Sequence, residues 1–210
     1  MRIVLALLVL IASFSVSASD FDDMKAAAEQ GNAIAQYNLG VMYYNGIGVP
    51  QNYKDAVKWY KAAAEQGDAE AQYNLSLMYV DGEGVPQDYK EALKWCRAAA
   101  ERGHAEAQRS LGFVYKSGQV ISQDYKEALK WYKAAAEQGN AEAQNDLALM
   151  YLNGEGVAQD YNLAHMWYNL AAANGHENAV KGRDIAAGMM TPADISKAQQ
   201  MASDWMKAHP

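Results

Sequence analysis

The chain has 210 residues, a formal net charge of −7 and a single cysteine. An acidic chain without a basic cluster does not suit nucleic acid or an anionic membrane surface, because both attract basic proteins. The single cysteine excludes an intramolecular disulfide.

The first eighteen residues are typical of a secretory signal peptide. Met1 and Arg2 form a short basic start, residues 3–16 are almost wholly apolar, and small residues follow. Cleavage is expected after Ala18, which predicts a periplasmic or secreted protein. The alternative is an uncleaved anchor, but the apolar run is shorter than the ~20 residues of a spanning helix. We therefore expect no stable membrane insertion after cleavage.

A period of 36 residues organises the rest of the chain. Both a glycine and a tryptophan recur at this interval, which indicates a solenoid of small stacked units. We expect an N-terminal cap helix at 19–31, four units at 32–67, 68–103, 104–139 and 140–175, and C-terminal capping helices at 176–210. The recurring residues are Gly31, Gly67, Gly103, Gly139 and Gly175, with Trp59, Trp95, Trp131 and Trp167.

Each unit is expected to be a helix, a loop and a second helix. In the second unit, Asp68 is a suitable N-cap for a helix that runs to about Val80. A loop rich in glycine and proline follows. Asp88 and Glu91 have the spacing of a capping box for the second helix, which ends at Gly103.

Helical spacing assigns the buried faces of the two helices. In the first helix, Leu75 and Met78 lie on the core side with Ala71. Cys96 lies at a position of the second helix where the other units have tyrosine. We therefore expect it to be buried rather than reactive. Trp95 flanks that stripe and is expected to pack against the next unit.

The third unit departs from this pattern in its loop. Val120 replaces a glycine that the other units retain, and Ser122 replaces the proline of the first two units. The loop from Ser117 to Gln123 is therefore expected to follow a different backbone path.

The chain resembles the Sel-1-like repeat (SLR) family, which is related to the tetratricopeptide solenoids. The motif residues are Ala-Glu-Ala-Gln-Tyr-Asn-Leu at 69–75, Gly-x-Gly-Val-Pro-Gln-Asp-Tyr at 82–89, and Glu-Ala-x-x-Trp at 91–95, and the pattern recurs in all four units. The resemblance implies an all-α, right-handed superhelix whose first helices line the concave side. It also implies an adaptor or scaffold that binds a protein or peptide partner, or an inhibitor of another exported protein.

A different class of function is kept as an alternative. Some cysteine-rich exported members of the family have been described as binding or slowly hydrolysing penicillin-type compounds. Those members carry a disulfide in each repeat, and this chain has only Cys96. A weak penicillin-binding or β-lactam-hydrolysing protein is therefore the second hypothesis, and no oligomeric state is predicted.

A second stripe of each first helix lies opposite the core and varies between units. A column that is free to vary is where a specific partner could be recognised. One column within the stripe is always apolar and could instead pack between units; it contains Val41, Leu77, Phe113 and Leu149. The candidate partner-binding residues are Tyr37, Tyr44, Tyr73, Arg109, Phe113 and Lys116.

We expect no catalytic residues, metal ligands or cofactor. His104 and His176 occupy the turn column and are expected to cap helices, while His165 falls in an apolar column and is expected to be a hydrogen-bonded core residue. The histidines, the cysteine and the carboxylates show no metal-ligand spacing. The sequence therefore predicts a binding protein and not an enzyme.

Overall fold

The computed structural model describes residues 18–209 and is all-helical over that range. The predicted signal peptide lies outside the described residues, apart from Ala18. None of the described helices is long and apolar enough to cross a bilayer. The helices are α1 (Ala18–Glu29), α2 (Ala33–Asn45), α3 (Tyr53–Glu65), α4 (Ala69–Asp81), α5 (Tyr89–Glu101), α6 (Ala105–Ser117), α7 (Tyr125–Glu137), α8 (Ala141–Asn153), α9 (Tyr161–Ala173), α10 (Ala179–Ala187) and α11 (Pro192–Ala208).

Side-chain caps explain where the helices of each pair begin. Asp68 accepts a hydrogen bond from the Ala71 N–H of α4, at 2.8 Å. Asp88 accepts from the backbone N–H groups of Lys90 and Glu91 in α5. Only this half of the predicted capping box forms: the Asp88 N–H donates to the Tyr79 carbonyl oxygen at 2.9 Å, and the Glu91 carboxylate pairs with Lys94.

The core of each pair is built from alanine, leucine and methionine. Leu75 and Met78 of α4 are buried against α3, and Cys96 of α5 is buried as predicted. Burial raises the pKa of the Cys96 thiol to about 12, so it is a poor nucleophile. Trp95 is predicted to pack against the next unit, but it packs on the cluster of α3 and α4 and not on that of α5 and α6.

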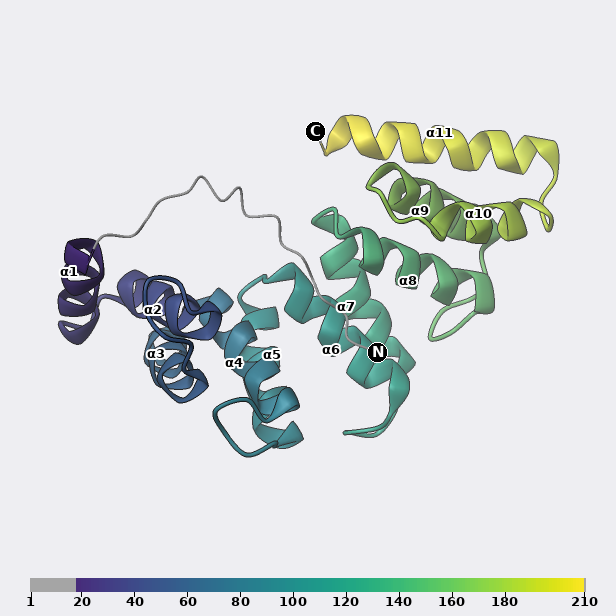
Figure 1. Ribbon diagram of the computed structural model, residues 1–210. Helices are drawn as coiled ribbons and strands as arrows, with labels where there is room; N and C mark the ends of the chain where they lie inside the picture. Colours follow the sequence, from purple (N-terminus) through teal and green to yellow (C-terminus); the bar gives the residue numbers. More distant parts are fainter. Residues whose placement is uncertain (1–17, 210) are drawn as a thin grey trace.

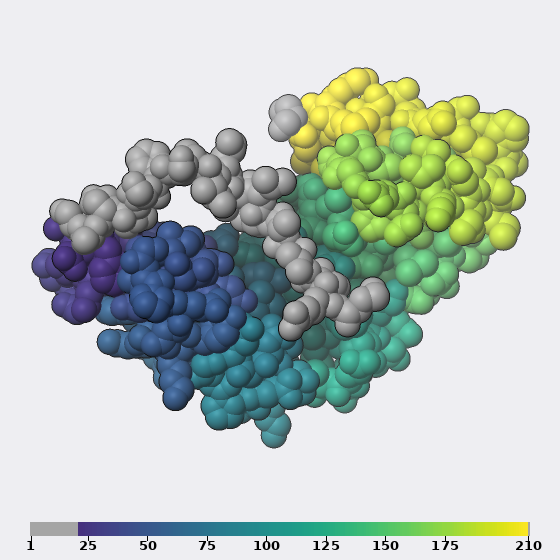
Figure 2. Space-filling view, viewed as in Figure 1, coloured from purple at the N-terminus to yellow at the C-terminus, as the bar shows by residue number. Residues whose placement is uncertain are grey.

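The pairs succeed one another along an arc from α1 to α11 (Figure 1). The space-filling view shows the colours in chain order without interleaving, so each unit touches its neighbours (Figure 2). Two contacts skip the second helix between them, since α2 contacts α4 and α8 contacts α10 of the C-terminal cap. The first helices α2, α4, α6 and α8 form the inner side of the curved stack. We call the side of these helices that faces away from the core the concave face; it includes Ile34, Leu77 and Phe113. The predicted all-α solenoid is confirmed.

Glutamine side chains connect successive units through a ladder of buried hydrogen bonds. Gln72 of α4 donates to the Ala64 carbonyl at the end of α3, at 3.0 Å. Gln108 makes the equivalent bond to Ala100, at 3.1 Å. These bonds satisfy carbonyls at the C-termini of the second helices, which lack intrahelical partners.

The loop of the third unit differs from the loops around it. Gly84 has a φ of 74°, close to the values of its counterparts in the first and fourth units, and a Cβ there would clash with the Tyr53 carbonyl oxygen. Val120 stands at the equivalent position, and no non-glycine residue of the described chain has a positive φ. The valine can adopt neither this conformation nor this approach, so the loop follows a different path, as predicted. Tyr89 and Val120 are left exposed beside each other around a cavity of about 380 Å³.

The C-terminal cap corrects two predictions about histidines. His176 caps no helix by its side chain, because α10 begins three residues later; only its backbone carbonyl oxygen takes part, by accepting from the Ala179 N–H. His165 is buried as predicted, but its Nδ1 has no hydrogen-bond partner. His104, by contrast, caps α6 by accepting from Ala107 N–H at 3.1 Å.

Candidate functional site

The concave face carries exposed apolar side chains on three successive first helices. Phe113 of α6 is 57% exposed, Leu77 of α4 is 40% exposed and Ile34 of α2 is 68% exposed. The apolar column therefore does not pack between units at Leu77 and Phe113. Val41, at the start of the same column, does pack against the cluster of α3 and α4.

The three candidate tyrosines are half-buried on the same face. Tyr37 lies 5.9 Å from the ring of Tyr60, and burial is the main cause of its raised pKa. Tyr73 packs at 4.6 Å on the ring of His104, and its hydroxyl lies 3.5 Å from Ser110 Oγ. Tyr73 thus contacts the third unit, whereas Tyr37 packs on a ring of its own unit.

Tyr44 lies at the loop end of the concave face, at the end of α2. Its ring is 5.4 Å from that of Tyr53. Burial and then the nearby Glu83 carboxylate raise the pKa of Tyr44 to about 12, so the hydroxyl is a hydrogen-bond donor at neutral pH.

The two candidate cations are already paired across the joint between the third and fourth units. Arg109 Nε lies 3.3 Å from Asp146, and its Nη2 lies 3.6 Å from Glu142. Lys116 Nζ lies 2.9 Å from Glu155, and less than a quarter of each of these two side chains is exposed. Burial raises the pKa of Asp146, and Arg109 opposes that rise. Both cations therefore hold two units together as well as facing the concave side.

A second set of contacts between units is not evident from the sequence pattern. The second residue of a first helix reaches the residue that precedes the next first helix, 34 positions later. Asn140 donates to Glu106 at 2.6 Å, and His104 Nε2 lies 3.3 Å from Glu70. Because His104 Nδ1 accepts the cap bond, Nε2 carries the proton towards Glu70. The constant spacing of acidic and capping residues is the signal that could have identified these pairs.

The same position in the first unit breaks this pattern. Ile34 stands where the later units have glutamate, and it cannot bond to Asp68 as Glu106 bonds to Asn140. It contributes an exposed apolar side chain to the concave face instead.

The repeats match a known sequence family over most of the chain. The family described as Sel1 repeat matches residues 33–68, 69–104, 105–140 and 141–176. The chain belongs to the Sel1 repeat family. Proteins built from Sel1 repeats generally mediate protein–protein interactions.

Solved Sel1 structures share this fold. The chain is 34% identical to a protective antigen of uropathogenic Escherichia coli with an SLR fold, with a TM-score of 0.80 over 90% of this chain and 40% of that one. It is also 34% identical to a Sel1 repeat protein of Oxalobacter formigenes, with a TM-score of 0.76 over 92% of this chain and 80% of that one. The chain thus spans less than half the length of the Escherichia coli protein.

A curated relative matches over a single repeat. It is a putative sel1-like repeat-containing protein, L18, of Acanthamoeba polyphaga mimivirus, which is 50% identical over 38 residues. That stretch covers 18% of this chain and 6% of the viral protein.

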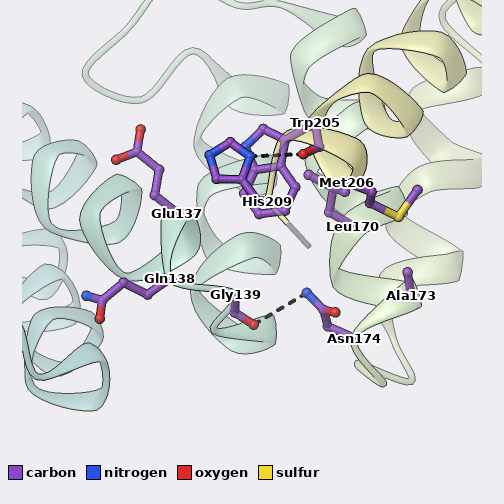
Figure 3. A pocket seen from close by; sticks show the side chains of 9 residues that line it. All are labelled: Glu137, Gln138, Gly139, Leu170, Ala173, Asn174, Trp205, Met206 and His209. Atoms are coloured by element: carbon purple, nitrogen blue, oxygen red, sulfur yellow. Dashed lines mark hydrogen bonds between the residues drawn. The ribbon is translucent and has the colours of Figure 1, made fainter.

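A separate pocket of about 360 Å³ lies where the last Sel1 repeat meets the C-terminal cap (Figure 3). The ring of His209 stacks on Trp205 at 4.2 Å, and His209 Nδ1 lies 2.9 Å from the Trp205 carbonyl oxygen. Asn174 donates to the Gly139 carbonyl at the bottom of the view, and Glu137 points away from the stacked rings. The lining includes no serine, threonine, cysteine or lysine, so it brings no hydroxyl, thiol or amine nucleophile of these types to His209.

Metal-ligating side chains do not gather in the described part of the Sel1 repeats. Residues 18–209 contain no group of three or more histidine, cysteine, aspartate or glutamate side chains that could hold an ion. The concave face combines exposed apolar side chains with residues that differ from one repeat to the next, which makes that face the candidate functional site.

Proposed function

We propose that this protein is an exported interaction module that binds a protein or peptide on the concave face of its Sel1 repeats. It would act as an adaptor, a scaffold or an inhibitor, without a covalent step. The observation that carries the proposal is the exposure of Ile34, Leu77 and Phe113 along that face. Large apolar side chains gathered on one face of a protein typically mark an interaction site.

Two further features support this proposal. The basic start and apolar run of residues 1–18 support export. The half-buried Tyr37, Tyr44 and Tyr73 supply rigid rings beside the apolar positions. Aromatic side chains in such settings dominate binding energies at protein interfaces.

Site-directed photo-crosslinking tests the binding face. Benzoylphenylalanine replaces Phe113 or Tyr73 in the chain with its N-terminal segment, expressed in its own cells. Both positions should trap the same partner, and the partner's contact peptide should be identified by mass spectrometry. The control position is Lys94, an exposed residue of α5 outside the concave face.

The purified partner then allows a quantitative check. Phe113→Ser should weaken its binding by about tenfold or more, since buried aromatic anchors contribute most of the affinity. Equal trapping at Lys94 and Phe113, or unchanged affinity of Phe113→Ser, would refute the concave face as the binding site. Mass measurement of the protein from the cell envelope tests export separately, with Ser19 as the expected first residue.

A further inference from the structure

Two joints of the solenoid place a loop carboxylate against the end of the preceding first helix. Between the third and fourth units, Glu155 of the loop forms an ion pair with Lys116 at 2.9 Å. The equivalent residues 72 positions earlier are Glu83 and Tyr44. The chain thus contains the same carboxylate site twice, once with its own lysine and once with a tyrosine.

Glu83 forms no ion pair with a cation within the described residues. Among residues 18–209, no lysine, arginine or histidine nitrogen lies within 4.0 Å of its carboxylate. Asp81, an exposed residue of α4, adds a second negative charge near Tyr44. Lys116 shows that this kind of site accommodates an alkylammonium group, because its ammonium reaches the equivalent carboxylate directly.

The helix that leads into this loop carries exposed apolar side chains on the concave face. Val80 is 36% exposed and occupies the position of Tyr44 one unit later, at the end of the helix that leads into the loop of Glu83. Leu77 precedes it by one turn of α4, and Phe113 is the equivalent of Leu77 on α6. The cations on this face, Arg109 and Lys116, are both occupied by carboxylates.

We infer that the concave face receives a basic segment of a partner protein, with a lysine or arginine on Glu83 and apolar side chains on Leu77, Val80 and Phe113. The inference rests on the proposed function and names the chemistry of the partner. An acidic partner would be repelled by Glu83, by Asp81 and by the net charge of −7 of the chain. A basic partner gains a charge-assisted contact where the chain supplies none.

Two substitutions test the charged contact in opposite ways. Glu83→Gln removes the carboxylate. Tyr44→Lys places a cation in the chain itself, where it should bind Glu83 as Lys116 binds Glu155 and exclude an external one. Glu101→Gln is the matched control, because Glu101 is an exposed carboxylate of α5 outside the concave face.

The probes are two fluorescein-labelled peptide pools of about 12 residues. One pool combines lysine and arginine with leucine and phenylalanine, and the other replaces its basic positions with glutamate. Fluorescence anisotropy is measured at about 50 mM and about 300 mM NaCl, because screening weakens charged contacts. The basic pool should bind more tightly than the acidic pool, and more weakly at the higher salt concentration.

Glu83→Gln and Tyr44→Lys should each weaken binding of the basic pool by about tenfold, and Glu101→Gln by less than about twofold. Circular dichroism checks folding, and Glu83→Gln decides the matter if Tyr44→Lys does not fold. Equal binding of the two pools, or unchanged binding by Glu83→Gln, would overturn the inference. If Phe113 still traps a partner in that case, the proposed function stands and only the partner's chemistry is wrong.

Discussion

The side-chain amide of Gln66 donates a 2.7 Å hydrogen bond to Gln36 Oε1, thirty residues earlier in the chain. The second unit lacks the equivalent bond, because Arg102 occupies the position of Gln66 and lies over Gly67. The acceptor in that unit, Gln72 Oε1, is buried without a hydrogen-bond partner. A break in the ladder therefore lies within the second unit.

Arg102→Gln should repair this break. The new amide would donate to Gln72 Oε1, and the free energy of unfolding should rise by about 1 kcal/mol, since an unsatisfied buried acceptor is costly. Urea unfolding followed by circular dichroism measures the change. Gln66→Arg is the reverse control and should lower stability by a similar amount. Equal stability of wild type and Arg102→Gln would show that the ladder contributes nothing.

Substituting two glycines with positive φ distinguishes the cost of backbone strain from the cost of a steric clash. Gly103 has a φ of 90° and open space where a Cβ would be, so Gly103→Ala should cost about 1–2 kcal/mol of strain. Gly84 has a φ of 74°, and a Cβ there would clash with the Tyr53 carbonyl, so Gly84→Ala should cost about 3 kcal/mol or more. Thermal and urea melts compare the two. A smaller loss for Gly84→Ala than for Gly103→Ala would contradict the role assigned to the close approach.

The 36-residue period is sufficient to predict the solenoid, because a core contact that recurs in every unit leaves the same residue type in every unit. Leu75 and its equivalents Leu39, Leu111 and Leu147 are all buried for this reason. The interactions that occur only once are not predictable in the same way. Arg109 pairs with Asp146, and the residue equivalent to Asp146 in the second unit is Asn74. Comparing equivalent positions one at a time does not reveal that two residues, each found in one unit only, contact each other.

The role of a histidine in the turn column depends on the segment after it. His104 and His176 share this column, but only His104 precedes a helix that begins at the next residue. Where the repeat ends, the column no longer defines the structure, so His176 is not a cap. The predicted site residues stay predictions of partner contact, although their positions on one face follow from helical spacing alone.

Arg109→Ala should destabilise the fold although the residue is partly exposed. Asp146 would lose its cation while it stays mostly buried, which should lower the free energy of unfolding by about 1–2 kcal/mol. Asp146→Asn in the Arg109→Ala background should recover most of that loss. Urea unfolding of the two single variants and the double variant gives the coupling. Additive losses would show that the ion pair is not a stabilising contact.

The same variant should show a characteristic pH dependence. Burial raises the pKa of Asp146 in the folded protein, and Arg109 opposes this rise. Without the arginine the folded-state pKa rises further, so the folded protein binds its proton more tightly than the unfolded chain does. Protonation then relieves the cost, and the deficit of Arg109→Ala should shrink as the pH falls from about 7 towards 3.8, the ordinary pKa of an aspartate. A deficit that grows at lower pH would have the wrong sign.

His165→Leu should stabilise the protein and remove part of its sensitivity to mild acid. Leucine occupies the equivalent position in α5 and α7, and the substitution removes the unpartnered Nδ1, so the free energy of unfolding should rise by about 1 kcal/mol at pH 7.5. Burial, and to a lesser extent the charge of Arg183, lowers the folded-state pKa of His165 below 6.5, while Asp184 acts in the opposite direction. The unfolded chain therefore binds the proton first, and the wild type should lose stability as the pH falls below 6.5. The advantage of His165→Leu should accordingly be larger at about pH 5 than at about pH 7.5, measured by urea midpoints. An advantage that is the same at both pH values would show that His165 does not titrate differently on unfolding.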